Sequence, residues 1–164
     1  MQTIKRWGVK KIGLVMISTS LISCGGGYRN EVLVDIFNKN KYSFNIIKDV
    51  LVERSSIELV SLNAQADSVQ NYCSDGVYPY EACATALLSL KSAGVKEIRS
   101  FRRHDNSALI SIRFVMFRRG LFFGGQMESI DYIEASEAIK FVKDQGFVLP
   151  LTSSWYIVKI DDVH

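Results

Sequence analysis

The chain has 164 residues, of which 48% are hydrophobic and 23% charged, a composition typical of globular proteins and unlike that of disordered ones. Four of its 20 basic residues and none of its 17 acidic residues precede Cys24, so removal of the first 23 residues would leave 16 basic against 17 acidic residues. That balance argues against nucleic-acid binding driven by net positive charge, and the remainder suits one domain.

The N-terminus shows the three parts of an export signal in the expected order. The four basic residues come first, followed by an apolar run at residues 12–22 and then by small residues before Cys24. The apolar run is shorter than the roughly 20 residues that a permanent membrane-spanning helix needs. We therefore expect residues 1–23 to be a cleaved signal peptide; a secretory signal with an incidental cysteine and an uncleaved anchor are the alternatives.

The segment Leu21-Ile22-Ser23-Cys24 resembles the lipobox of bacterial prolipoproteins. The resemblance implies that the Cys24 thiol receives a diacylglyceryl group, that a dedicated peptidase cuts before it, and that the new N-terminus carries further acyl chains such as palmitate. Gly25, where inner-membrane lipoproteins have Asp, resembles sorting to the outer membrane. Two or more acyl chains hold a protein stably on a membrane. The expected location is thus the periplasmic face of the outer membrane.

Residues 24–30 are expected to form a flexible tether, because three consecutive glycines hold no fixed conformation. Residues 31–164 then form one periplasmic domain. Its first apolar stretch, at 31–37, is expected to break at residues 38–40, and Ser43 to cap a helix whose apolar residues recur at helical spacing up to Leu51.

Later elements follow from spacing and from glycine and proline. A short strand at 57–62 and a polar loop at 63–78 precede a second helix at 79–93, which Pro79 opens and Gly94 ends. Alternating residues predict strands at 95–103, 108–117, 126–134 and 155–160, and a short helix or structured loop at 135–145 stopped by Gly146. Together they predict an α+β fold with two main helices on a largely antiparallel sheet of about five strands.

Two cysteines remain once Cys24 is lipidated. Because the periplasm is oxidising, Cys73 and Cys83, ten positions apart, are a candidate disulfide. Alternatively, Cys83 is a buried small hydrophobe on one face of the second helix. No zinc site is expected, since the chain has no Cys-x-x-Cys pair and its two histidines are His104 and the terminal His164.

The sequence contains no motif for a nucleophile, a metalloprotease or a phosphate-binding loop. His104, the one interior histidine, falls in a predicted turn, where a solvated role is the simpler interpretation. Glu128 and Asp131 could be imagined as a glycosidase pair, but residues three apart on a strand point to opposite faces. We expect no catalytic residues and no cofactor, and an enzyme is the least favoured class.

Two further features suggest contact surfaces. Residues 96–119 hold seven basic and two acidic residues, and Glu128, Asp131 and Glu134 on the next strand are expected to neutralise them. Leu121, Phe122 and Phe123, with Trp155, are candidates for binding a protein partner if exposed. The alternatives are that the three loop residues plug one end of the core and that Trp155 packs within a strand.

The mature part also resembles, loosely, a class of small uncharacterised bacterial lipoproteins. The shared features are a helix near Phe44, the sequence Leu90-Lys91-Ser92-Ala93-Gly94, Gly120-Leu121, Gly125 ahead of Ile130 and Tyr132, and a late Trp155-Tyr156. Where the class has Lys-Gly, this chain has Glu128-Ser129. The resemblance implies an α+β lipoprotein domain and no particular activity.

The interpretation favoured by these features is a membrane-anchored, non-catalytic module that recognises an envelope protein, for example in toxin immunity or hydrolase inhibition. The alternative is a structural or assembly component of the envelope. The lipid anchor makes the membrane an expected partner in both.

Overall fold

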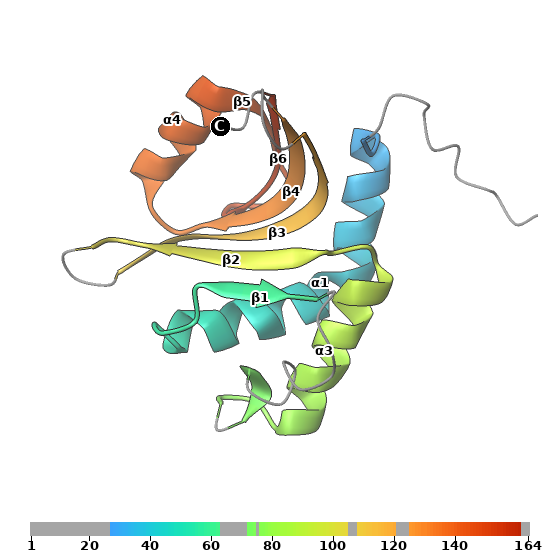
Figure 1. Ribbon diagram of the computed structural model, residues 1–164, viewed down its shortest axis with the longest axis vertical. Coiled ribbons are helices and arrows are strands. Elements are labelled where there is room, and N and C mark those ends of the chain that lie inside the picture. Colours follow the sequence, from blue (N-terminus) through green and yellow to red (C-terminus); the bar gives the residue numbers. More distant parts are fainter. Residues whose placement is uncertain (1–26, 63–71, 75, 105–107, 121–124, 162–164) are drawn as a thin grey trace, which may run out of the picture.

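A six-stranded antiparallel sheet carries helices on both faces (Figure 1). The computed structural model describes residues 27–62, 72–74, 76–104, 108–120 and 125–161. Their helices are α1 (Asn30–Glu53), α3 (Tyr80–Ser92) and α4 (Ser136–Gln145), and their strands are β1 (Leu59–Ser61), β2 (Glu97–Arg102), β3 (Leu109–Arg119), β4 (Gln126–Ile133), β5 (Gly146–Pro150) and β6 (Trp155–Asp161). Helices α1 and α3 cover one side, named here the α1/α3 face, and α4 covers part of the other, the α4 face.

These elements confirm the α+β class and correct the finer expectation of two main helices and about five strands. The additional helix is α4, at the place where a short helix or structured loop was expected. The additional strand is β5, which begins at Gly146. Gly146 both ends α4 and opens the strand, because its extended backbone places it directly against Lys159 of β6.

The strands follow the order β1-β2-β3-β4-β6-β5, and each neighbouring pair is antiparallel. Antiparallel register places directly paired residues on the same face. One row of such partners crosses four strands on the α4 face: Arg99, Arg113, Asp131 and Tyr156. Glu128, three residues before Asp131, consequently lies on the α1/α3 face, so the expected separation of these two carboxylates is confirmed.

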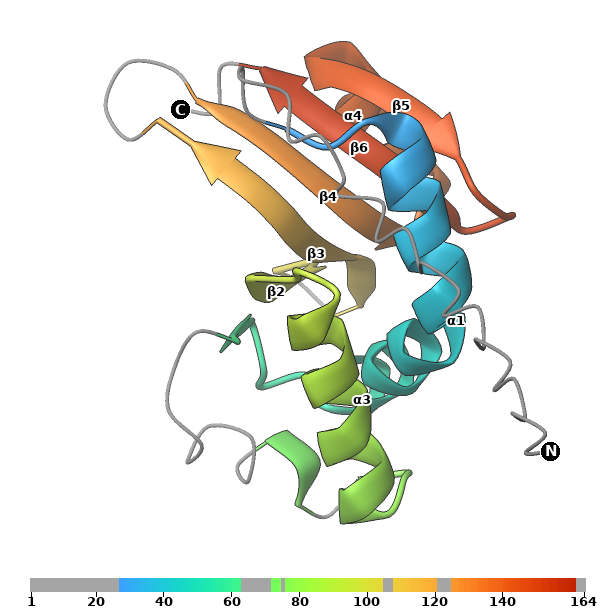
Figure 2. The same ribbon diagram turned by 90° about the vertical axis from the view of Figure 1, so that its right-hand side faces the viewer.

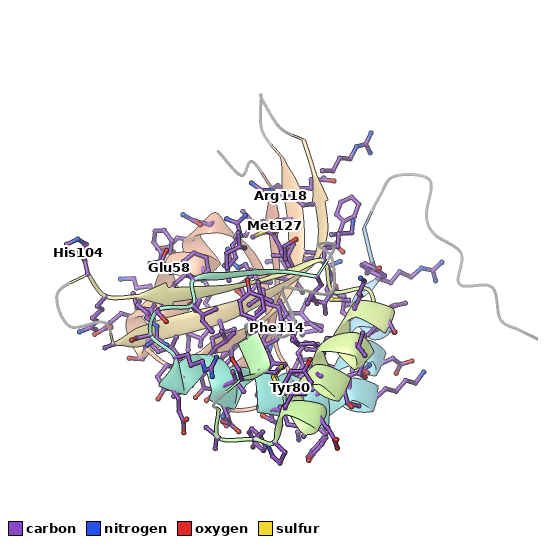
Figure 3. All side chains as sticks on the ribbon, turned by 60° about the horizontal axis from the view of Figure 1, so that its bottom comes forward. Glu58, Tyr80, His104, Phe114, Arg118 and Met127 are labelled. Carbon is purple, nitrogen blue, oxygen red and sulfur yellow. A yellow bond between two sulfur atoms is a disulfide. The ribbon has the colours of Figure 1, made fainter. Side chains whose placement is uncertain are left out.

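The main core lies on the α1/α3 face and centres on four aromatic side chains. Phe37 and Phe44 of α1 meet Phe114 of β3 and Trp155 of β6, with ring centroids 4.9 Å apart for Phe44–Phe114 and 5.3 Å apart for Phe37–Trp155. Figure 3 shows Phe114 among the side chains that fill this layer. Aromatic pairs at such separations stabilise a core by more than the burial of their apolar surface alone.

A smaller core lies on the α4 face. Val142 of α4 packs against apolar residues of β3, β4 and β6: Val115, Met127, Val158 and Ile160. Val142 is the one side chain of α4 that is buried. The helix is therefore lightly attached, and part of the α4 face stays open toward β1, β2 and β3.

Helix α1 is much longer than expected and is not broken at residues 38–40. The Asn40 side chain donates a hydrogen bond to the Ile36 carbonyl at 2.9 Å and accepts one from Ser89 Oγ of α3, also at 2.9 Å. The Asn40 side chain thus has one hydrogen-bond partner within α1 and one on α3, so a polar residue is accommodated where the helix continues. The helix changes direction about midway (Figures 1 and 2), which lets its two halves follow the curved sheet.

Part of the expected tether is bound to the sheet. The Tyr28 backbone N–H donates to Glu128 Oε2 at 2.5 Å, Lys159 Nζ donates to the Tyr28 carbonyl at 2.5 Å, and Lys159 and Glu128 form an ion pair at 3.2 Å. Gly27 has φ +122, and a side chain there would collide with Glu128. The chain therefore crosses β4 and β6 before it enters α1 (Figure 2), and residues 24–26 lie outside the described residues.

Helix α3 agrees with the sequence expectation at both ends and carries the disulfide. Pro79 precedes the helix, and Gly94 follows it with φ +97. Cys73 and Cys83 form the disulfide, with their Cα atoms 5.5 Å apart and both side chains buried. Of the expected strand at 57–62, residues Leu59–Ser61 are in β1, and most of the loop at 63–78 lies outside the described residues.

Candidate functional site

An open cleft of about 400 Å³ lies between α4 and strands β2 and β3. Ala138, Phe141 and Val142 line it from α4, because their spacing places them on one helical face. Phe101 and Arg113 line it from the sheet. The volume falls within the range of small-molecule and side-chain binding pockets, roughly 300–1,000 Å³.

The aromatic side chains of the cleft are unusually accessible. Phe141 is 62% exposed and Phe101 is 38% exposed. At one end of the cleft an ion pair at 2.8 Å joins Arg103, just after β2, to Glu137 of α4. This surface ion pair contributes at most about 1 kcal/mol. The cleft therefore presents apolar surface that no described part of the chain covers fully.

A buried ion pair forms the polar base of the cleft. Arg113 Nε donates to Asp131 Oδ2 at 2.9 Å, with the Arg113 side chain 15% exposed and the Asp131 side chain 0% exposed. The guanidinium also lies 5.4 Å from the centre of the Phe101 ring. Of the three acidic residues expected to neutralise the basic segment, Asp131 does so, in direct register with Arg113. The expectation was wrong for Glu128, which pairs with Lys159 of β6, and Glu134 instead accepts a hydrogen bond from Tyr132.

Asp131 makes few hydrogen bonds for a carboxylate that is fully buried. Among the described residues, Asp131 Oδ1 and the Ser129 hydroxyl make no hydrogen bond of ordinary length. Burial raises the pKa of Asp131, and it outweighs the lowering effects of Arg113 and of nearby Ser129. Asp131 therefore holds its proton to a higher pH in the folded protein than in the unfolded chain.

This shift gives the stability a defined pH dependence. A carboxyl whose folded pKa is raised stabilises the fold most at low pH, and that contribution falls as pH rises from about 4 through the folded pKa. Asp131→Asn cannot titrate, so the unfolding free energy of the wild type minus that of the variant should decrease with rising pH. Urea unfolding of both proteins between pH 4 and 8 measures this difference. A difference that is flat, or that increases with pH, would contradict the assignment.

The structure places the residues singled out in the sequence at separate locations. Trp155 is 5% exposed and sits in the aromatic core, so it belongs to the packing of the fold and not to an exposed contact surface. His104 is exposed in a turn after β2 and stands away from the body of the molecule in Figure 3. Cys24, Leu121, Phe122 and Phe123 lie outside the described residues.

Two glycines flank the apolar loop between β3 and β4, and each lies where a side chain would be strained. Gly120 has φ +90, and a Cβ atom on Gly125 would lie 2.8 Å from the Arg119 carbonyl oxygen. Both positions thus require glycine for the turn between β3 and β4.

The residues that form the cleft carry no motif that marks them in the sequence. Arg113 appeared only as one member of a basic run, and Phe101 and Phe141 appeared as ordinary members of a strand and a helix. The one available signal was a pair of apolar residues, Phe141 and Val142, between the charged residues Lys140 and Lys143, since one helix face buries only the second of them.

Neither metal binding nor membrane spanning is evident in the part of the chain that the structure describes. No three His, Cys, Asp or Glu side chains gather there as a metal site. No helix among these residues has the length and apolar character needed to cross a membrane.

Neither family models, nor curated proteins, nor solved structures match this chain. Its function must therefore be inferred from the site itself and from the N-terminal sequence.

Proposed function

We propose that this protein is a bacterial lipoprotein whose domain acts as a non-catalytic binding module for another envelope protein. In this proposal residues 1–23 are removed, Cys24 is acylated, and the domain is held at the periplasmic face of the outer membrane. The lipobox-like segment supports the anchor. A role in toxin immunity or hydrolase inhibition is one concrete form of the binding function.

The observation that carries the binding role is the open cleft beside α4. Phe141 and Phe101 expose large apolar surface next to an arginine, and aromatic residues and arginine are enriched where proteins bind one another. In the proposed arrangement the domain lies close to the membrane, because Tyr28 is bound to the sheet and the three residues from Cys24 to Gly27 reach only about 10 Å. A domain so close to the membrane would meet partners in the same envelope layer.

Two measurements test the two halves of the proposal. Intact-mass analysis of the protein purified from a Gram-negative host should show the mass of the chain from Cys24 onward plus acyl groups, and Cys24→Ser should release it from the membrane fraction. A photo-crosslinking amino acid at position 141 should give a discrete crosslinked product with an envelope protein.

The matched control for the crosslink is position 88. Leu88 is 58% exposed on α3, which lies on the other face of the sheet. Crosslinking from 141 but not from 88 supports the binding role. An unmodified residue 24 would contradict the anchor, and equal or absent crosslinking from the two positions would contradict the binding site.

A further inference from the structure

Two arginines stand side by side on the α4 face without an acidic residue between them. Arg99 of β2 and Arg113 of β3 are direct register partners, so their side chains leave the same face of adjacent strands. Like charges placed directly opposite in a sheet are destabilising. Two arginines can nevertheless remain paired in this way when each forms an ion pair with an acidic residue elsewhere.

Each arginine is held by its Nε atom alone. Arg99 Nε donates to Glu97 Oε1 at 2.9 Å, and Arg113 Nε donates to Asp131 Oδ2 at 2.9 Å. Within the described structure neither guanidinium uses its Nη groups in a hydrogen bond. Glu97 lies two residues along β2 and Asp131 lies on β4, beyond Arg113, so both carboxylates flank the pair.

This geometry suits an incoming carboxylate. The guanidinium fork binds carboxylates through two parallel hydrogen bonds, and a fork that is already oriented loses less entropy when it does so. The Nε bonds to Glu97 and Asp131 orient both forks, and the Phe101 ring lies against that of Arg113. Arg113 lines the cleft and its side chain is 15% exposed, and the side chain of its neighbour Arg99, beside the cleft, is 38% exposed.

Three exposed apolar side chains lie on the same face as the two arginines. Leu59, the register partner of Arg99 on β1, is 48% exposed, and Phe101 and Phe141 lie on the cleft side. This exposed stretch extends over β1, β2 and α4 beyond the cleft itself. Its length and its mixture of aromatic residues and arginine fit an extended segment of a protein better than an enclosed small molecule.

We infer that the open part of the α4 face binds an acidic, apolar segment of the partner protein. A carboxylate of that segment lies between Arg99 and Arg113, and a neighbouring large apolar side chain enters the cleft against Phe101 and Phe141. The inference rests on the proposed binding function and specifies the chemistry of the partner.

Defined peptide probes test this chemistry without knowledge of the partner. The chain is produced with its own leader and purified in mild detergent, so the form that the cell makes is the form tested. The probes are N-acetyl-Leu-Phe with a free carboxylate, the same dipeptide as an amide, N-acetyl-Glu-Phe-amide, and inorganic phosphate. Binding is followed through the NMR signals of the arginine Nε–H groups.

The inference expects the free carboxylate, the Glu-containing amide, or both to shift the Arg99 and Arg113 signals, with the uncharged amide binding about tenfold more weakly. Binding of the first probe alone indicates a chain-terminal carboxylate, and binding of the Glu-containing probe indicates an acidic side chain. Binding of neither, or of phosphate alone, overturns the inference.

A matched pair of variants locates the site. Arg99→Gln should weaken the binding of the charged probes about tenfold, whereas Arg29→Gln should leave it unchanged. Arg29 is exposed at the start of α1, which packs on the other face of the sheet. Equal effects of the two substitutions would overturn the inference.

Probe binding and the proposed function can fail separately. Probe binding requires neither acylation of Cys24 nor the natural partner. A positive probe result with no crosslink from position 141 would contradict the proposed envelope partner, while the reverse result would contradict the carboxylate chemistry alone.

Discussion

Phe114→Ala should lower the free energy of unfolding by about 3–5 kcal/mol, among the largest losses expected from a single substitution in this protein. Phe114 is 0% exposed, and the centre of its ring lies 4.9 Å from that of Phe44 and 5.7 Å from that of Trp155. Truncation removes the transfer free energy of the ring and leaves a cavity between α1 and β6 that their backbones cannot close. The loss should appear in urea unfolding followed by tryptophan fluorescence.

The fluorescence signal is specific, because Trp155 is the one tryptophan after residue 23 and it belongs to the same aromatic cluster. Phe141→Ala is the matched control. It deletes the same ring from a side chain that is 62% exposed, so its loss should stay below about 1 kcal/mol. If Phe114→Ala does not fold, Phe114→Leu should still unfold at a lower urea concentration than Phe141→Ala. Similar losses at the two positions would contradict the core assigned here.

The sequence predicted elements well where local signals and tertiary packing agree. Pro79 and Gly94 delimit α3 because one lacks an N–H that the first turn does not need and the other takes a positive φ at the helix end. The alternation in residues 108–117 predicted most of β3 because its apolar side chains face the larger core. In both cases the information lies within one short stretch of chain.

The sequence failed where a distant contact decides the local structure. Asn40 reads as a helix breaker, but α1 continues through it because Ser89 of α3 donates to its side chain. In the sequence, Gly146 indicates the end of a helix. That it also begins β5 depends on its pairing with Ile160 of β6. Neither contact could be foreseen without knowing which elements lie side by side.

The candidate site could not be predicted from the sequence for the same reason. The Arg99–Arg113 pairing depends on strand register, and a shift of one residue would move one arginine to the opposite face. The register also shifts between Phe101 and Arg102 and between Val115 and Phe117. Counting basic residues in the sequence therefore showed that charge is present but not that two arginines converge beside a cleft.

Replacing both Cys73 and Cys83 by alanine should reduce the free energy of unfolding by about 3 kcal/mol. The disulfide closes a short loop, with a sequence separation of 10, and so restricts the unfolded chain. It also ties the segment before Pro79 to α3, which packs on α1. Both side chains are buried, at 2% and 1% exposure, and alanine leaves no polar group unsatisfied there.

Urea unfolding with and without reductant separates the crosslink from the packing of the two sulfur atoms. Reductant should destabilise the wild-type protein to nearly the level of the double variant and leave the double variant unchanged. Cys24→Ser, which retains the crosslink, should respond to reductant as the wild type does. A wild-type protein that reductant does not affect, with the double variant equally stable, would show that Cys83 serves only as a small hydrophobic side chain on α3 and that the loop is held by its other contacts.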